Sequence, residues 1–122
     1  MANKRRVLIA DDEEGIRESL GLILSEEYDV TFAKDGEEAS AKMRREPFAL
    51  VLLDIKMPKL DGLDIVKRLK GNSRHAPIVM LTAYQSVELA KEAIKLGAAD
   101  YLPKPFEREQ VLKAVHSILD KP

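Results

Sequence analysis

The chain has 122 residues, 45% of them apolar, with a formal net charge of −1 and no cysteine. This length suits one domain, over residues 1–122, while the charge argues against a general nucleic-acid surface and the missing cysteines exclude disulfides and thiolate chemistry. Because no apolar run is long enough to span a membrane and the first residues lack the apolar region of a signal peptide, we expect a cytoplasmic protein.

Strand-like and helix-like patterns alternate along the chain. The first half carries an apolar run, a helical pattern, an alternating segment and a good helix former, at residues 6–10, 13–27, 28–33 and 35–46. The second half repeats the alternation three times, with strand candidates at 48–53, 78–81 and 100–103 and helix candidates at 63–70, 86–96 and 107–120.

Five strand–helix units in a row predict parallel strands joined by right-handed helical crossovers, an α/β fold. Continuous apolar runs are typical of strands covered on both faces, so 6–10, 48–53 and 78–81 should be the inner strands. The alternating segment 28–33 and the proline-containing segment 100–103 should be the edges. The sequence therefore predicts a doubly wound five-stranded parallel sheet with strand order 2-1-3-4-5.

Polar side chains follow the predicted strands at their C-terminal ends. Asp11 and Asp12 follow the first strand, Asp54 the third, Thr82 the fourth and Lys104 the fifth. In an open parallel sheet these ends share one edge, and ligands bind there where the strand order reverses. We expect three carboxylates, a hydroxyl and an ammonium to meet in one crevice.

The three acids need a neutralising partner. Two carboxylates ~4 Å apart repel by about 4 kcal/mol at an effective dielectric constant near 20. Magnesium suits such a site, because it takes few protein oxygens and keeps waters that a phosphate can replace. The alternative is that Asp11 or Asp12 only caps the helix that follows. Capping explains one acid, but not a doublet that faces a third.

These segments resemble the receiver domain of two-component response regulators. The resemblance rests on "ADDEE", "LLDIKMPKLDG", "MLTAY", "LGAADYLPKPF" and the fivefold alternation, and it covers nearly the whole chain. It implies the flavodoxin-like (βα)5 fold. It also implies a signalling phosphoacceptor and not an enzyme in the usual sense, because such a domain catalyses only its own phosphoryl transfer and dephosphorylation.

The resemblance implies roles for the residues at the strand ends. Asp54 would be the phosphoacceptor, taking a phosphoryl group from a phosphohistidine to form an acyl phosphate. Asp12, Asp54 and the backbone carbonyl of Lys56 would bind magnesium directly, with Asp11 binding through water and manganese able to substitute. Lys104 would pair with the phosphoryl group.

A switch is implied as well. Thr82 would donate its hydroxyl to the phosphoryl oxygen, and Tyr101, which we expect to end a neighbouring strand, would change rotamer with it. The two would bias a surface formed by residues 86–96, 100–103 and 107–119. The Lys104–Pro105 peptide bond should be cis, as it usually is in the family.

Lys56 and Tyr84 are expected to modulate the lifetime of the signal. They lie two residues past Asp54 and Thr82, so their long side chains should flank the crevice. There they would hinder attack by water on the acyl phosphate. The alternative is that both point into solvent and matter little.

The implied partners are a sensor histidine kinase or histidine phosphotransfer protein, and an output domain or downstream protein. No direct contact with nucleic acid or membrane is expected of this domain, and a phosphorylation-dependent dimer is left open. "GAADYLPKPF" resembles receivers of nitrogen-regulation-type activators, whereas Lys56 with Tyr84 resembles a single-domain sporulation phosphorelay receiver. Whether the chain stands alone or begins a longer regulator is also left open.

Three other classes of protein share parts of this pattern. A haloacid-dehalogenase-type phosphatase needs a second acid two residues after its nucleophile, where this chain has Lys56. A flavodoxin-like carrier needs a hydroxyl- and glycine-rich loop after the first strand, and "DDEEG" would repel the flavin phosphate. A non-phosphorylated protein-interaction module of the same fold is the remaining alternative, which magnesium-dependent labelling by acetyl phosphate would distinguish.

Overall fold

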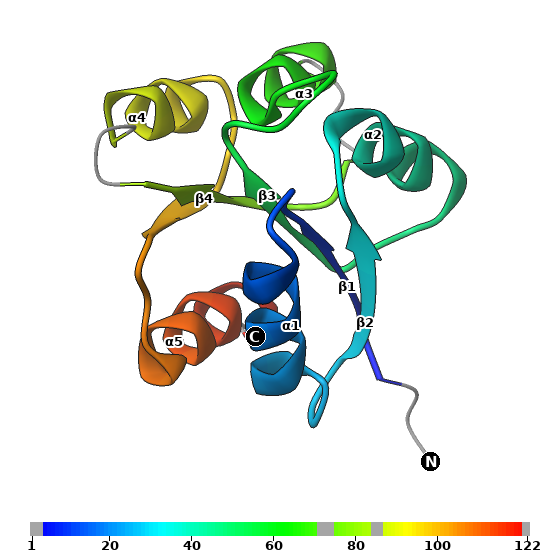
Figure 1. Ribbon diagram of the computed structural model, residues 1–122, viewed down its shortest axis with the longest axis vertical. Helices are drawn as coiled ribbons and strands as arrows, with labels where there is room; N and C mark the ends of the chain where they lie inside the picture. Colours follow the sequence, from blue (N-terminus) through cyan, green and yellow to red (C-terminus); the bar gives the residue numbers. More distant parts are fainter. Residues whose placement is uncertain (1–3, 71–74, 84–86, 121–122) are drawn as a thin grey trace.

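The structure is a computed structural model that describes residues 4–70, 75–83 and 87–120 (Figure 1). Its strands form one parallel sheet in the order β2-β1-β3-β4-β5, which confirms the predicted topology. The strands are β1 (Arg6–Ala10), β2 (Asp29–Ala33), β3 (Leu50–Asp54), β4 (Ile78–Thr82) and β5 (Asp100–Pro103).

Helices cover both faces of the sheet. They are α1 (Glu14–Leu24), α2 (Gly36–Arg45), α3 (Gly62–Leu69), α4 (Val87–Lys95) and α5 (Arg108–Leu119). The helices α1 and α5 lie on one face, and α2, α3 and α4 lie on the other (Figure 1). None of the helices in the described ranges has the length and apolarity needed to cross a membrane.

The core consists of two apolar clusters separated by the sheet. Successive side chains of a strand point to opposite faces, so Leu8 and Val51 join the cluster under α2, α3 and α4, while Val7 and Leu52 join the one under α1 and α5. Every residue of β3 and β4 is buried, as expected for inner strands. Full burial stabilises each apolar side chain of these two strands by about 1.5–3 kcal/mol.

Two predicted boundaries were wrong. The helix expected over 13–27 ends at Leu24, because the chain turns there to bury Tyr28, whose N–H donates to the Leu24 carbonyl. The strand expected over 48–53 begins at Leu50 and includes Asp54 as its last residue. Phe48 lies before this strand, where its ring packs against the Arg6 guanidinium, whose central carbon lies 4.9 Å from the ring centre.

Turn and cap residues fix the loops on which the crevice depends. Asp35 and Asp61 cap α2 and α3. The side chain of each accepts a hydrogen bond from the backbone N–H of the residue three positions later, at 2.9 Å in both cases. Gly97 ends the α4 segment at φ 121°, where a side chain would be strained.

Candidate functional site

The strand order brings three carboxylates to one place. Asp54 ends β3, Asp11 directly follows the neighbouring β1, and Asp12 comes next. One oxygen from each lies within 4.8 Å of the others. Asp11 and Asp54 are buried, whereas Asp12 is exposed. The acids therefore meet as the predicted topology requires, at the reversal point between β1 and β3.

Lys104 reaches these acids from the end of β5. Its Nζ lies 2.7 Å from Asp11 Oδ2 and 3.4 Å from Asp54 Oδ2. The backbone holds it there, because its N–H donates to the Thr82 carbonyl at 2.7 Å. The Lys104–Pro105 bond is cis, as expected. Without a phosphoryl group, the ammonium pairs with the carboxylates, a partnership that the sequence had not predicted.

The electrostatics show that the crevice is short of positive charge. Burial, followed by the Asp11 carboxylate, raises the pKa of Asp54 to about 7, although the Lys104 ammonium opposes that shift. Burial by itself would lower the pKa of Lys104, but its bonds to the two acids outweigh burial and raise it. One cation does not neutralise the buried acids.

The donor set fits a hard cation. Asp11 Oδ1 accepts the N–H of Glu13 at 2.9 Å. The capping alternative was nevertheless wrong, because Glu13 itself is the N-cap of α1 and this cap has no side-chain hydrogen bond. Asp11 Oδ2 is buried and, within the described residues, accepts no hydrogen bond of ordinary geometry, its contact with Lys104 being an ion pair. A buried carboxylate oxygen left over beside two further carboxylates is the type of ligand that magnesium takes.

Thr82 and Tyr101 lie on neighbouring strands but at different levels. Thr82 is buried at the end of β4, and its hydroxyl donates to the Ala83 carbonyl at 3.0 Å. The expectation that Tyr101 ends its strand was wrong, because Tyr101 lies opposite Met80 and β5 continues to Pro103. The strand continues because Leu102 is buried in the other cluster, under α1 and α5. Tyr101 is half-buried and packs against the apolar cluster under α2, α3 and α4.

Lys56 stands at the edge of the site with an exposed side chain, and its backbone N–H lies 3.4 Å from Asp54 Oδ1 as donor. Tyr84, the other residue expected to guard the crevice, lies outside the described residues. The expectation for the pair therefore stays a prediction.

The start of α3 touches the backbone of Asp54, which sequence reasoning had missed. A Cβ on Gly62 would lie 2.2 Å from the Asp54 carbonyl oxygen. The Gly62 N–H donates to the Ile55 carbonyl at 2.7 Å. The sequence showed Asp61-Gly62 only as a turn or helix start; the available signal was a glycine directly after a capping aspartate, where a side chain is usually tolerated.

Comparison with known proteins gives the family. The protein-family model of the response regulator receiver domain matches residues 7–116 of this sequence. The chain belongs to this family. The receiver domain is 40% identical over 115 residues to the response regulator MprA of Mycobacterium leprae, covering 93% of this chain and 50% of that protein. It thus spans about half the length of the curated relatives it matches.

Solved structures agree with the assignment. The receiver domain of NtrX from Brucella abortus matches at 32% identity with a TM-score of 0.86, covering 95% of this chain and 99% of that one. The chemotaxis protein CheY4 from Vibrio cholerae matches at 35% identity with a TM-score of 0.86, covering 96% and 100%. The family and fold predicted for this receiver domain are confirmed, and it is a signalling domain of two-component systems with an acidic pocket that could hold a metal.

Proposed function

We propose that this receiver domain accepts a phosphoryl group on Asp54 in a magnesium-dependent reaction. The donor is the phosphohistidine of a sensor histidine kinase or phosphotransfer protein. An Asp54 oxygen attacks phosphorus, the bond from phosphorus to the imidazole nitrogen breaks, and an acyl phosphate forms. The observation that carries the proposal is the crevice itself, where Asp54 lies 3.4 Å from the Lys104 ammonium and within 4.8 Å of two more carboxylates.

The other residues of the crevice serve this chemistry. Asp12, Asp54 and the Lys56 carbonyl would hold the ion, with Asp11 acting through water. When bound, the ion supplies positive charge to the phosphoryl oxygens. Lys104, already within reach of Asp54, would exchange part of its contact with the acids for a phosphoryl oxygen. Burial keeps bulk water away from the Asp54 carboxylate.

The output lies on the face made by α4, β5 and α5. Thr82 ends β4 next to β5, so its hydroxyl can respond to the phosphoryl group and change the space open to Tyr101. This surface would engage an output domain or a downstream protein. Lys56, exposed beside Asp54, would slow attack by water and lengthen the signal, together with Tyr84.

The test is labelling of the purified protein by acetyl phosphate, read by intact mass. We expect one phosphoryl group on the parent, magnesium-dependent and released by hydroxylamine, as an acyl phosphate requires. Asp54→Asn should remain folded and unlabelled, while Asp64→Asn, an exposed acid in the first turn of α3, should label like the parent. An acid-stable phosphoserine, or labelling of Asp54→Asn, would contradict the proposal. A folded parent that takes no label would favour the interaction module.

A further inference from the structure

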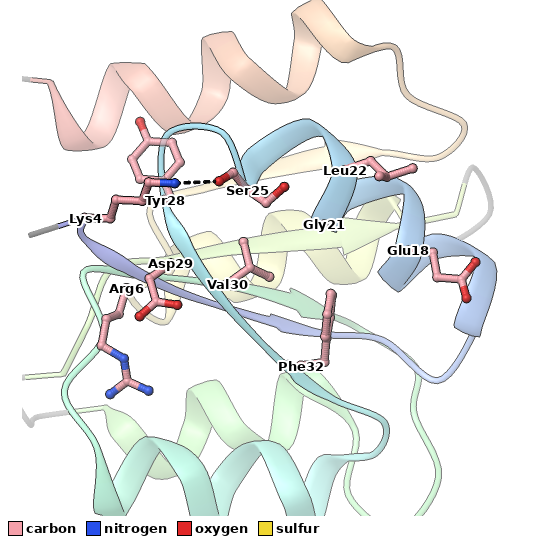
Figure 2. A pocket seen from close by; sticks show the side chains of 10 residues that line it. All are labelled: Lys4, Arg6, Glu18, Gly21, Leu22, Ser25, Tyr28, Asp29, Val30 and Phe32. Atoms are coloured by element: carbon pink, nitrogen blue, oxygen red, sulfur yellow. Dashed lines mark hydrogen bonds between the residues drawn. The ribbon is translucent and has the colours of Figure 1, made fainter.

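A second surface lies beside the free edge of the sheet. In the described part of the chain three large apolar side chains are exposed, and two of them are Leu22 of α1 and Phe32 of β2. They line a groove between α1 and β2 (Figure 2). The third, Ile94 of α4, belongs to the output face. Phosphoryl chemistry does not account for Leu22 and Phe32, which are 76% and 39% exposed.

Gly21 holds the aromatic ring in place. A Cβ at Gly21 would lie 2.7 Å from Phe32 Cζ, so the ring occupies the position that a side chain of α1 would take. One side of the ring lies against the helix, and the ring remains partly open to solvent. An aromatic side chain already ordered by packing loses little conformational entropy when a partner covers it.

The backbone at this edge is open. Asp29 donates its N–H to the Arg5 carbonyl, toward β1. Because backbone groups alternate in direction along a strand, the N–H and C=O of Val30 and Phe32 point away from β1. The contact of the Lys42 ammonium with the Phe32 carbonyl agrees with this. Within the described ranges nothing covers the corresponding groups of Val30. Such groups can pair with another strand.

The two ends of the groove carry opposite net charge, since Lys4 and Arg6 outnumber Asp29 at one end and Glu18 lies at the other. Lys4 lies where β2 begins and donates to the Ser25 carbonyl at 3.0 Å. Glu18 lies at the other end, on the side of Phe32 (Figure 2). A groove with a basic end, an apolar middle and an acidic end is complementary to its own copy turned by a two-fold axis.

We propose that two copies of this domain associate about a two-fold axis at Thr31, with their β2 strands antiparallel. Val30 of one copy then faces Phe32 of the other and exchanges backbone hydrogen bonds with it, while Thr31 faces its counterpart. The two Leu22 side chains cover the seam. Two five-stranded sheets become one continuous sheet.

The helices leave room for this arrangement. Both α1 and α2 contact β1 as well as β2, so each lies inward of the edge. With strands about 4.8 Å apart, a helix centred over β1 and β2 would lie roughly 10 Å from its copy across the junction. That is close to the usual packing distance of two helices, about 8–10 Å. Lys42 can keep its bond, because a carbonyl oxygen accepts twice.

This dimer would not depend on phosphorylation. The β2 edge lies at the opposite side of the sheet from β5. Pairing there leaves the crevice and the α4–β5–α5 face open in both copies. The net charge of −1 gives little repulsion between the copies.

The experiment is sedimentation velocity of the unphosphorylated protein over a concentration series. We expect a reversible monomer–dimer equilibrium. Leu22→Lys should weaken it by about tenfold or more, since it buries unpaired charge at the seam. Phe32→Lys and Ile94→Lys form a matched pair, because their side chains are 39% and 38% exposed. Phe32→Lys should lose the dimer, and Ile94→Lys should keep it. Urea unfolding checks that both variants remain folded.

Charge reversal tests the two-fold arrangement itself. Lys4→Glu and Glu18→Lys should each weaken the dimer, and the double variant should recover it, because the two charged ends exchange sign together. Amide exchange by NMR should slow at Val30 and Phe32 as concentration rises. A monomer at every concentration, equal loss in Phe32→Lys and Ile94→Lys, or no recovery in the double variant would overturn the proposal. Failure of Asp54 labelling would leave these outcomes unaffected.

Discussion

The Asp54 carboxyl is subject to opposing influences. Burial and the Asp11 carboxylate favour its protonated form, while Lys104 favours its ionised form, and the pKa settles at about 7. The residue proposed as nucleophile is therefore only partly ionised at neutral pH when no further cation is present. A bound magnesium ion would favour the carboxylate and thus prepare the nucleophile.

This pKa has a consequence for stability. Between the ordinary value of 3.8 and about 7 the folded protein holds a proton on Asp54 that the unfolded chain has lost. The free energy of unfolding should therefore fall as pH rises through this window, in the absence of magnesium. Asp54→Asn removes the effect and should be more stable than the parent at pH values above the window, by on the order of 2 kcal/mol after allowance for partial solvent screening.

Urea unfolding of both proteins across that pH range measures the difference. Magnesium should reduce it, because the ion binds the folded parent more tightly than the variant. Glu92→Gln, on the exposed side of α4, is the control and should follow the parent. A parent-to-variant difference that does not change with pH would refute the assignment.

For the residues of the crevice, the sequence predicted which side chains meet but not how they pair. Asp11, Asp12, Asp54 and Lys104 follow strands whose order could be inferred, so their convergence was predictable. The ion pair of Lys104 with Asp11 depends on rotamers and on the path of the loop after β5, which no periodicity reports. The bounds predicted for β5, 100–103, are confirmed, and only the place of Tyr101 within that strand was wrong.

Among the elements, the β3–α3 connection is the constraint that touches the backbone of Asp54 directly. The start of α3 packs on the carbonyl of Asp54 with no space for a side chain at Gly62. Gly15, in the first turn of α1, differs: a Cβ there would meet no atom within 4 Å. The two glycines therefore have opposite expectations in substitution.

Gly15→Ala should raise the free energy of unfolding by about 0.5–1 kcal/mol, because alanine has less backbone freedom to lose in a helix. Gly62→Ala should lower it by about 2–3 kcal/mol through overpacking and should slow labelling of Asp54, since the backbone that carries this carboxylate must shift. Urea unfolding and phosphorylation rates test both. Equal effects of the two substitutions would contradict the close approach.

Element types and order were well predicted, and the bounds of β1 and β5 were confirmed, but the end of α1 and the start of β3 were not predicted. Apolar runs marked β1, β3 and β4 because these strands are covered on both faces. The end of α1 was missed because Glu26 and Glu27 are good helix formers, and only the burial of Tyr28 makes the chain turn before them. Tertiary packing overrides local preference at such points.

At the scale of the whole molecule, the proposed switch requires the crevice to bias a distant face. Moving a two-state surface from 1:99 to 99:1 needs about 5.5 kcal/mol of differential interaction. One hydrogen bond from Thr82 to a charged phosphoryl oxygen supplies about 1.5–3 kcal/mol. Lys104 and the loop around it would have to supply the remainder.

Thr82→Ala should therefore reduce the response of the α4–β5–α5 face substantially, without removing it. The measurement is the set of NMR shifts on that face upon addition of a beryllium fluoride phosphoryl mimic. Ser40→Ala, which removes a hydroxyl from α2, is the control and should respond like the parent. Unchanged shifts in Thr82→Ala would show that another residue couples the two regions.

The crevice is assembled from segments far apart in the chain. Its acids follow β1 and end β3, its hydroxyl ends β4, and its ammonium follows β5. During synthesis, Lys104 leaves the ribosome after the three acids. Until then the acids lack the ammonium group that pairs with them. Long-range strand pairing is also the slow part of folding. The proposed competence to be phosphorylated would therefore arise last, and a kinase that recognises this crevice would ignore incomplete or misassembled copies without a separate quality check.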